Sequence, residues 1–309
     1  MPASADGGAP HRGPRVALFV EDEGGDWHAR RLTKSLEARG ARVVTTSLNR
    51  CAFDTRLPSG LDIPGCDGHL PDAAFVRSVS AGSLEQITLR LGILHALEAS
   101  GVRVWNNPRA IERCVDKSTA TWRFQRAGLP TPETRTAEGR DAAVTDRRGR
   151  GTLVLKPLFG SQGNGVRRVA ESDDLPPPED VGDVYYLQEY LRGPDAASFE
   201  DWRVLVSRGR VLSAMIRRGR TWITNVHQGA EPVGYDPDAE MRDYALRATE
   251  AVGADYAGVD LIRAIDGRLL VLEINSNPAW KGLQSVSGFD IADTLAEDFL
   301  ADVGASAPR

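Results

Sequence analysis

The feature that most constrains the fold is the stretch at residues 258–280, GVDLIRAIDGRLLVLEINSNPAW. Apolar residues alternate on both sides of Asp266-Gly267. An Asp-Gly pair in this setting favours a two-residue type I′ turn, so the stretch predicts an antiparallel hairpin. A two-residue turn fixes the register of the two strands and places Ile265 opposite Arg268.

That register predicts a candidate metal site. Counting back from the turn puts Asp260 opposite Glu273, and strand alternation puts Asn275 on the same face as Glu273. Like charges directly opposite one another destabilise a sheet, and a cation between them reverses the effect. Oxygen ligands suit a hard ion such as Mg2+. The alternative is a solvated polar face on an edge hairpin.

Composition limits the classes of function. The chain has 309 residues, enough for two or three domains with a core. Its net charge of -5 gives no electrostatic reason to expect nucleic-acid or membrane binding. Apolar runs are too short for a membrane helix, and residues 1–14 lack the apolar segment of a signal peptide. We expect these 14 residues to be a disordered lead and the protein to be cytoplasmic.

Cysteine usage agrees with that compartment. The three cysteines are odd in number and do not have metal-ligand spacing, which favours reduced thiols: Cys51, Cys66 and Cys114. The sequence also offers no Ser-His-Asp or Cys-His signature, so we do not expect a covalent nucleophile.

The N-terminal third alternates apolar strands with amphipathic helices. We expect strands at 15–20, 42–46, 73–77 and 102–105, and helices at 27–39 and 84–100. This order predicts a parallel sheet, whose ligands bind at the carboxyl ends of the strands. Five side chains there are candidate substrate contacts: Asp22, Glu23, Trp27, His28 and Arg77. Ordinary loop polarity is the alternative for each.

A glycine-rich segment follows a strand that ends in a lysine. Residues 153–156 read LVLK, the segment FGSQGNG follows at 159–165, and a second strand is expected at 166–169. Backbone N–H groups of such a loop can bind phosphates, and Lys156 adds a point charge suited to the same ligand. The segment lacks the GxxxxGK[ST] pattern of a P-loop. An ordinary turn is the alternative.

The remaining chain predicts a second hairpin and a basic cluster. A strand at 185–190 precedes a hairpin whose turn is Arg208-Gly209, with Asp201 and Arg203 on one face. The basic cluster comprises Arg217, Arg218 and Arg220, and it is either an anion site or solvated surface. We expect loops at 136–151, 175–180 and 278–284, a helix opened by Asp236-Pro237, and a closing helix at 290–302.

Taken in order, these motifs resemble those of the ATP-grasp ligases, specifically the RimK-type α-L-glutamate ligases. The matching segments are LVLKPLFGSQGNGV, LQEYL, DWRVLV, TNVHQGA, AGVDLIR and LEINSNPAWKGLQSVSGFDIA, within residues 115–302. FVEDEGGDWHARRL and VDKSTA resemble more loosely the branch near the tetrahydromethanopterin and related cofactor glutamate ligases. Ala230 and Trp280 depart from the family pattern, and both bear on the acceptor.

The resemblance implies a mixed α/β ATP-grasp fold. It comprises an N-terminal pre-ATP-grasp α/β domain at 15–112, a central domain at 113–190 and a C-terminal domain at 191–302, the last two built on antiparallel sheets that clasp ATP. ATP contacts are implied for Lys117, Lys156, Ser161, Gln162, Gly163, Gln188, Glu189, Tyr190, Leu191 and Asp201. Mg2+ ligands are implied at Asp260, Glu273 and Asn275, and the catalytic residues at Arg203, Arg217 and Asn225.

The implied reaction is amide formation through an acylphosphate, with ATP and Mg2+, or Mn2+ in its place, as cofactors. The implied partners are L-glutamate and a small-molecule carboxylate such as a tetrahydromethanopterin-like cofactor, and a homo-oligomer is compatible with the resemblance. Two alternatives stay open. One is a glutamyl ligase for a protein or peptide tail, and the other is a non-catalytic ATP-binding module.

Overall fold

The computed structural model describes residues 13–21, 26–160, 163–191 and 199–306. Contacts within the chain separate two compact units. The first combines the chain up to Trp105 with the residues from Ala292 onward, and the second runs from Asn106 to Ile291. In the described ranges, no helix has both the length and the apolar character needed to cross a membrane.

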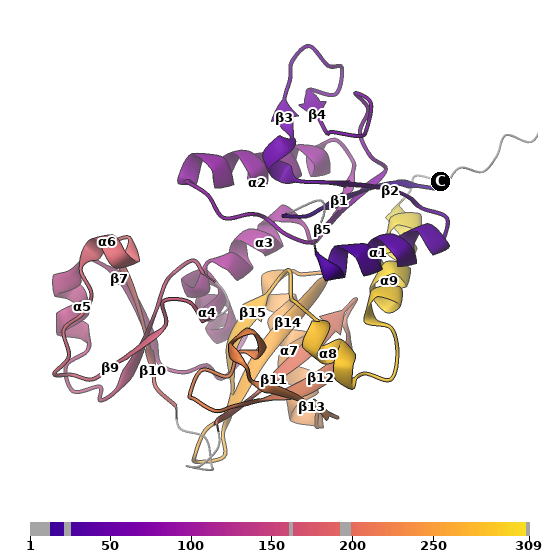
Figure 1. The fold of residues 1–309 in the computed structure, drawn as a ribbon. Helices are drawn as coiled ribbons and strands as arrows, with labels where there is room; N and C mark the ends of the chain where they lie inside the picture. The colour runs from indigo at the N-terminus through magenta and orange to yellow at the C-terminus, as the bar shows by residue number, and fades with distance from the viewer. Residues whose placement is uncertain (1–12, 22–25, 161–162, 192–198, 307–309) are drawn as a thin grey trace, which may run out of the picture. The chain divides into compact units, whose positions relative to one another are not determined.

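The first unit contains the parallel sheet that the sequence predicts. Its four strands lie in the order β2-β1-β5-β6, and every pair is parallel (Figure 1). The elements are β1 (Arg15–Phe19), α1 (Trp27–Ala38), β2 (Arg42–Thr46), a 3-10 helix η1 (Leu48–Arg50), β3 (Ala52–Phe53), β4 (Leu61–Asp62), β5 (Ala73–Val76), α2 (Leu84–Ala99) and β6 (Arg103–Trp105). The small β3–β4 pair is antiparallel.

The closing helix α9 (Ile291–Ser306) packs on this first unit. The ring of Phe299 lies 5.3 Å from that of Phe75 and 5.7 Å from that of Trp105, measured between centroids. Arg103 also donates to Asp302 at 2.7 Å. The last helix of the chain therefore completes the core of the N-terminal sheet, and the three-domain division stays a prediction.

The second unit begins with two helices and a four-stranded antiparallel sheet in the order β7-β10-β8-β9. Its elements are α3 (Pro108–Val115), α4 (Lys117–Arg126), β7 (Thr134–Glu138), α5 (Arg140–Asp146), β8 (Leu153–Lys156), β9 (Arg167–Val169), α6 (Pro178–Val181) and β10 (Val184–Glu189). The loops expected at 136–151 and 175–180 are wrong. Part of the first is β7, which pairs with β10, and α5, whose Ala143 is buried among Leu153 and Leu155; part of the second is α6.

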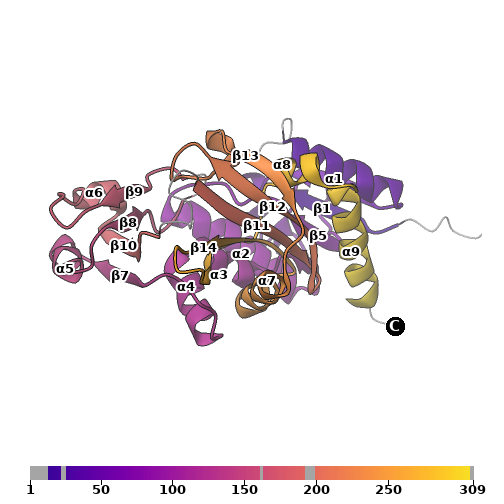
Figure 2. The same ribbon diagram turned by 90° about the horizontal axis from the view of Figure 1, so that it is seen from below.

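A five-stranded antiparallel sheet in the order β13-β12-β11-β14-β15 completes this unit. Its elements are β11 (Phe199–Ser207), β12 (Arg210–Gly219), a 3-10 helix η2 (Val226–Gln228), β13 (Glu231–Tyr235), α7 (Ala239–Val252), β14 (Tyr256–Arg263), β15 (Leu269–Asn275) and α8 (Lys281–Val286). Helix α7 lies along one face of the sheet (Figure 2) and buries Met241, Ala245, Ala248 and Val252 against it.

Two helix expectations need correction in this region. Helix α7 starts after Asp238, whose side chain accepts from the Met241 N–H at 2.9 Å, so Asp236-Pro237 precedes the cap instead of forming it. The loop expected at 278–284 contains the start of α8, because buried Leu283 anchors a helical turn there.

The β14–β15 hairpin has the predicted pairing of Asp260 with Glu273, but a different turn. The Ala264 carbonyl oxygen accepts from the Gly267 N–H, and the Ala264 N–H donates to the Arg268 carbonyl oxygen, so the loop has three residues. Within this loop, only Gly267 has positive φ, at 85°. The expected two-residue type I′ turn is wrong. A β-bulge beyond Asp260 shifts the register by one residue and restores the predicted pair.

Candidate active site

Four charged side chains form an alternating network on three neighbouring strands of the five-stranded sheet. Arg203 on β11 holds Asp260 on β14 with two parallel bonds, Nε–Oδ1 and Nη2–Oδ2, both of 2.7 Å. Arg217 on β12 holds Asp201 in the same way at 2.7 and 2.6 Å, and its Nη2 also lies 2.9 Å from Asp260. Thr224 donates to Asp201 at 2.6 Å. We call these four residues the Arg-Asp network.

Three of the four residues in the Arg-Asp network are buried. Asp201, Arg217 and Asp260 are each 5% exposed. Burial alone would raise the pKa of the Asp260 carboxyl, but Arg203 and Arg217 hold that pKa below its usual value. The neighbouring carboxylates outweigh burial at Arg217 and raise the pKa of its guanidinium. Burial raises the pKa of the Asp201 carboxyl in spite of Arg217. Bidentate bonds fix the positions of both Arg–Asp pairs.

Lys156, at the end of β8, has a neutral partner. Its ammonium group donates to Gln188 Oε1 at 2.7 Å and lies 6.0 Å from the centre of the Tyr186 ring. The Gln188 amide in turn donates to Tyr186 and Thr134. Burial lowers the pKa of Lys156, and the carboxylate of Glu273 opposes that shift. Gln188, expected as an ATP contact, is 1% exposed and orients the lysine.

Lys117 reaches the same charged region from the start of α4. Its ammonium donates to the carbonyl oxygens of Gly160 at 2.9 Å and Leu158 at 3.4 Å, in the segment before the glycine-rich turn. Burial lowers the pKa of Lys117, and Glu273 again opposes the shift. The structure thus brings both predicted lysines near one predicted metal ligand.

The predicted metal donors lie on adjacent strands. Asp260 faces Glu273 across the β14–β15 pair, and Asn275 follows two residues later opposite Gly258. Among the residues that the structure describes, no three His, Cys, Asp or Glu side chains gather as a metal cluster. Two carboxylates and an amide still suit Mg2+, which takes few protein ligands when phosphate oxygens complete its shell. Glu273 is not part of the Arg-Asp network, so its carboxylate is available to a metal ion.

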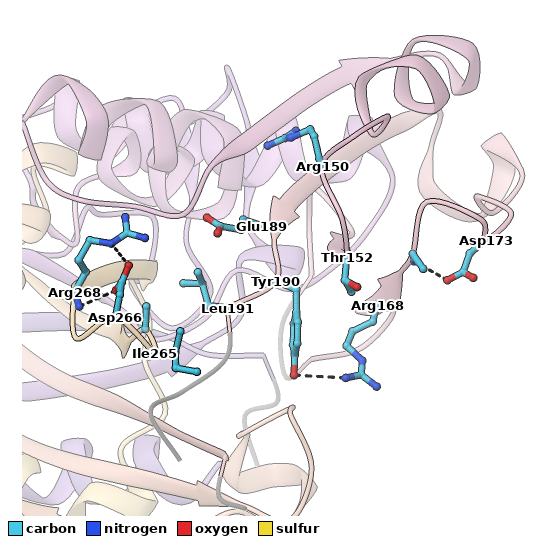
Figure 3. Close-up of a pocket in the computed structure, with 12 residues that line it drawn as sticks. Arg150, Thr152, Arg168, Asp173, Glu189, Tyr190, Leu191, Ile265, Asp266 and Arg268 are labelled. Carbon is cyan, nitrogen blue, oxygen red and sulfur yellow. Dashed lines mark hydrogen bonds and ion pairs between the residues drawn. The ribbon is translucent and has the colours of Figure 1, made fainter. Parts of the chain in front are cut away.

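A cavity of about 680 Å³ adjoins the end of β10. Three predicted ATP contacts, Glu189, Tyr190 and Leu191, are among its lining residues, and Figure 3 shows their side chains with those of the β14–β15 turn. The other lining residues are Arg150, Thr152, Arg168, Ala170, Asp173, Ala264, Ile265, Asp266 and Arg268.

The glycine-rich turn and the loop after β12 approach closely. Gly163 has φ of 74°, and a Cβ atom there would meet side-chain atoms of Ile223 and Gln228 at 2.9 Å each. Asn225 caps η2 through a bond from the His227 N–H at 2.8 Å. Ser161 and Gln162, both predicted ATP contacts, lie outside the described residues, as do Asp22 and Glu23.

The polar residues predicted at the N-terminal sheet form a separate cluster within the first unit. Asp26, which caps α1, accepts from His28 Nδ1 at 2.8 Å and lies 3.5 Å from Arg77 Nε. Burial would raise the pKa of Asp26, but the His28 bond and the charge of Arg77 lower it to about 2. Through these contacts with the capping residue Asp26, His28 and Arg77 support the start of α1.

Several residues of the second unit have roles that the sequence analysis missed. Asn106 is fully buried, and its side chain bonds to the backbone of Asp255, Tyr256 and Ser276, which joins the start of β14 to the end of β15. Two further examples are Thr224, which donates to Asp201, and Arg168, whose guanidinium lies over the Tyr190 and Trp222 rings. Only the position of Thr224 beside the basic cluster offered a signal, because the partners of the other two are distant in sequence.

Comparisons with known proteins agree with this geometry. The RimK-like ATP-grasp domain model matches residues 115–299. The tetrahydromethanopterin:alpha-L-glutamate ligase of Methanococcus maripaludis is 35% identical over 300 residues, covering 93% of this chain and 98% of the relative. A probable alpha-L-glutamate ligase of Aeromonas salmonicida is 30% identical, covering 88% of this chain and 92% of the relative.

A solved structure supports the fold. The ATP-grasp ligase PsnB, complexed with a phosphomimetic variant of its minimal precursor, Mg and ADP, superposes with a TM-score of 0.72 at 23% identity, covering 94% of this chain and 99% of PsnB. The family model spans more than half of the chain, and the relatives extend the match over the rest. The chain therefore belongs to the RimK-like ATP-grasp family and is an ATP-grasp ligase.

Proposed function

We propose that the chain is an ATP- and Mg2+-dependent carboxylate–amine ligase that adds L-glutamate to a carboxylate of a small cofactor, such as a tetrahydromethanopterin-like molecule. The observation that carries the proposal is the gathering of Lys117, Lys156 and Glu273 beside the Arg-Asp network. Two half-buried ammonium groups near a carboxylate suit a triphosphate and its metal ion.

The reaction proceeds in two steps. An oxygen of the acceptor carboxylate attacks the γ-phosphorus of ATP, the bond to the bridging oxygen breaks, and ADP leaves with that electron pair. The amine nitrogen then attacks the acyl carbon, phosphate leaves, and the amine proton passes to solvent. Lys117 and Lys156 offset the repulsion between the acceptor carboxylate and the triphosphate, so their contribution is electrostatic.

The residues present fit a magnesium ion. Glu273 and Asn275 would hold it, with Asp260 as the third donor where Arg203 and Arg217 share its oxygens. When bound, Mg2+ neutralises phosphate oxygens and orients the transferred phosphoryl group. Mn2+ has the same preference for oxygen ligands and is expected to substitute.

Arg203 and Arg217 support the assignment of a dicarboxylic amino acid. Each guanidinium has five N–H donors, and the bonds to Asp201 and Asp260 use Nε and Nη2. The Nη1 groups take no part in those bonds, so they can bind a carboxylate or phosphoryl oxygen. Asn225 adds an amide donor from the neighbouring loop. The relatives named glutamate ligases favour L-glutamate as the amine and an α-linked product.

The decisive experiment supplies ATP, Mg2+ and candidate acids with each amino acid in turn, and the product is weighed by mass spectrometry. We expect a glutamyl amide of a small cofactor. A different added amino acid rejects the glutamate assignment but leaves the ligase class. Modification of a peptide tail instead of a small acid favours the protein-modifying alternative, and ATP binding with no amide from any amine favours a binding module.

Glu273→Gln tests the metal assignment separately. The variant keeps the size of the side chain but loses the charge that faces Asp260, so we expect a normal fold and loss of nearly all turnover at saturating Mg2+. Near-wild-type turnover would remove Glu273 from the metal site.

A further inference from the structure

A cation and two aromatic rings join distant parts of the second unit beside the cavity. The guanidinium carbon of Arg168, on β9, lies 5.2 Å from the centre of the Tyr190 ring and 5.6 Å from that of Trp222. The two rings meet edge to face at 5.8 Å. Arg168 Nη1 also lies 3.5 Å from the Tyr190 hydroxyl, as Figure 3 shows. We call these three residues the Arg168 clasp.

The Arg168 clasp connects separate sheets. Arg168 is on the edge strand β9 of the four-stranded sheet, Tyr190 follows β10 of the same sheet, and Trp222 follows β12 of the five-stranded sheet. Arg168 and Tyr190 line the cavity of about 680 Å³. The close approach of Gly163 to Ile223 is a second contact between the same two segments.

The chemistry of the three groups favours a reversible contact. Cation–π attraction adds modest energy at a partly exposed site, and aromatic pairs prefer the edge-to-face arrangement seen here. Arg168 is exposed, while Tyr190 and Trp222 are half-buried, so none of the three is needed to fill a core.

We propose that the Arg168 clasp retains the nucleotide by holding β9 and the segment after β12 together at the wall of the cavity. The inference rests on the proposed function, which places the nucleotide beside Tyr190. The nucleotide leaves more readily when the clasp opens, so the clasp sets the rate of nucleotide release.

The test measures release of a fluorescent N-methylanthraniloyl-ADP from the full chain with Mg2+, chased with excess ADP in a stopped-flow instrument. Losing a cation–π contact of about 1 kcal/mol corresponds to roughly fivefold faster release for Arg168→Met. Trp222→Ala is expected to have a similar effect although it removes no charge. Arg168→Lys keeps a cation and should stay within about twofold of wild type.

Arg167→Met is the matched control. It removes the same charge from the neighbouring position of β9, where Arg167 is exposed and lies 3.6 Å from Asp180 at the surface. We expect wild-type release from this variant. The double variant Arg168→Met/Trp222→Ala should release more slowly than the product of the two single effects predicts, because the single variants share the Arg168–Trp222 contact.

The outcomes separate the two proposals. If wild type binds the analogue and the variants of the clasp release it at the wild-type rate, or if Arg167→Met matches Arg168→Met, the clasp is overturned and the ligase proposal stands. Failure of the wild-type chain to bind the analogue with Mg2+ overturns both.

Discussion

The two cationic regions of the site differ in what holds them. Lys156 donates to the neutral oxygen of Gln188, and Lys117 donates to backbone carbonyl oxygens. Arg203 and Arg217, in contrast, each hold a carboxylate with two parallel bonds. The lysines therefore keep a positive charge for a ligand, whereas the charge of the arginines is already balanced inside the sheet.

This difference predicts which substitutions change ligand affinity and which change the stability of the fold. A half-buried ammonium whose hydrogen-bond partners are neutral destabilises the unliganded fold and gains most when an anion binds. A buried ion pair contributes little net stability, but removing one partner leaves a charge with no compensation. We therefore expect substitutions of the lysines to change nucleotide binding and substitutions of the arginines to change stability and geometry.

The largest expected effect is that of Arg217→Ala on stability. The substitution leaves buried Asp201 with only the Thr224 hydroxyl among its described partners, so we expect the free energy of unfolding to fall by about 3–5 kcal/mol. Urea denaturation measures the change. Arg218→Ala is the matched control, because Arg218 is the next residue of β12 and its pair with Glu200 is partly exposed. A surface pair of this kind contributes less than about 1 kcal/mol.

Arg217→Lys sharpens the comparison. It keeps the charge but loses the planar fork that contacts Asp201 and Asp260 together, so turnover should fall sharply while ATP still binds. Equal losses of ATP binding and turnover would instead place Arg217 with the lysines.

Lys156→Ala is expected to change affinity and not stability. One charge-assisted contact contributes about 1.5–3 kcal/mol, so the dissociation constant for ATP should rise roughly 10- to 100-fold. Calorimetry measures the affinity, and urea denaturation of the same variant should show no loss of stability. An unchanged dissociation constant would remove Lys156 from the phosphate site.

The sequence predicted one strand pairing of the candidate site correctly, but not the side-chain contacts that join its residues. Counting residues back from Asp266-Gly267 predicted correctly that Asp260 pairs with Glu273. The count assumed a two-residue turn, which the structure does not have. The three-residue turn shifts the register by one residue, and the bulge shifts it by one residue in the opposite direction. The two shifts therefore cancel. Alternating apolar residues are compatible with either arrangement, so the pattern could not reveal the two shifts.

A second bulge shows the same limit at the other hairpin. Arg208 and Gly209 both have positive φ, at 45° and 68°, as a two-residue turn requires. Counting from that turn would put Asp201 opposite Ile216, but the bulge near Leu205 puts it opposite Arg217. The Arg-Asp network therefore depends on an irregularity that local propensity does not encode. The Arg168 clasp and the bonds of Asn106 depend likewise on residues far apart in sequence.

The smallest expected effect is the pH dependence of the lysine region. Burial lowers the pKa of Lys156 below the ordinary 10.5, so ATP affinity should begin to fall at a pH below 10.5, by at most about tenfold per pH unit. The stability of the unliganded protein is expected to change with pH in the opposite direction. Between the folded pKa and 10.5 the unfolded chain binds more protons, so the stability of the unliganded protein should rise with pH across that window. Lys156→Met, compared with wild type by calorimetry and urea denaturation over the same pH range, should show smaller dependences than wild type, and the remainder belongs to Lys117, whose pKa burial also lowers. If the variant keeps the full alkaline loss of ATP affinity, Lys156 is not the group that titrates and the contrast between the two cationic regions fails there.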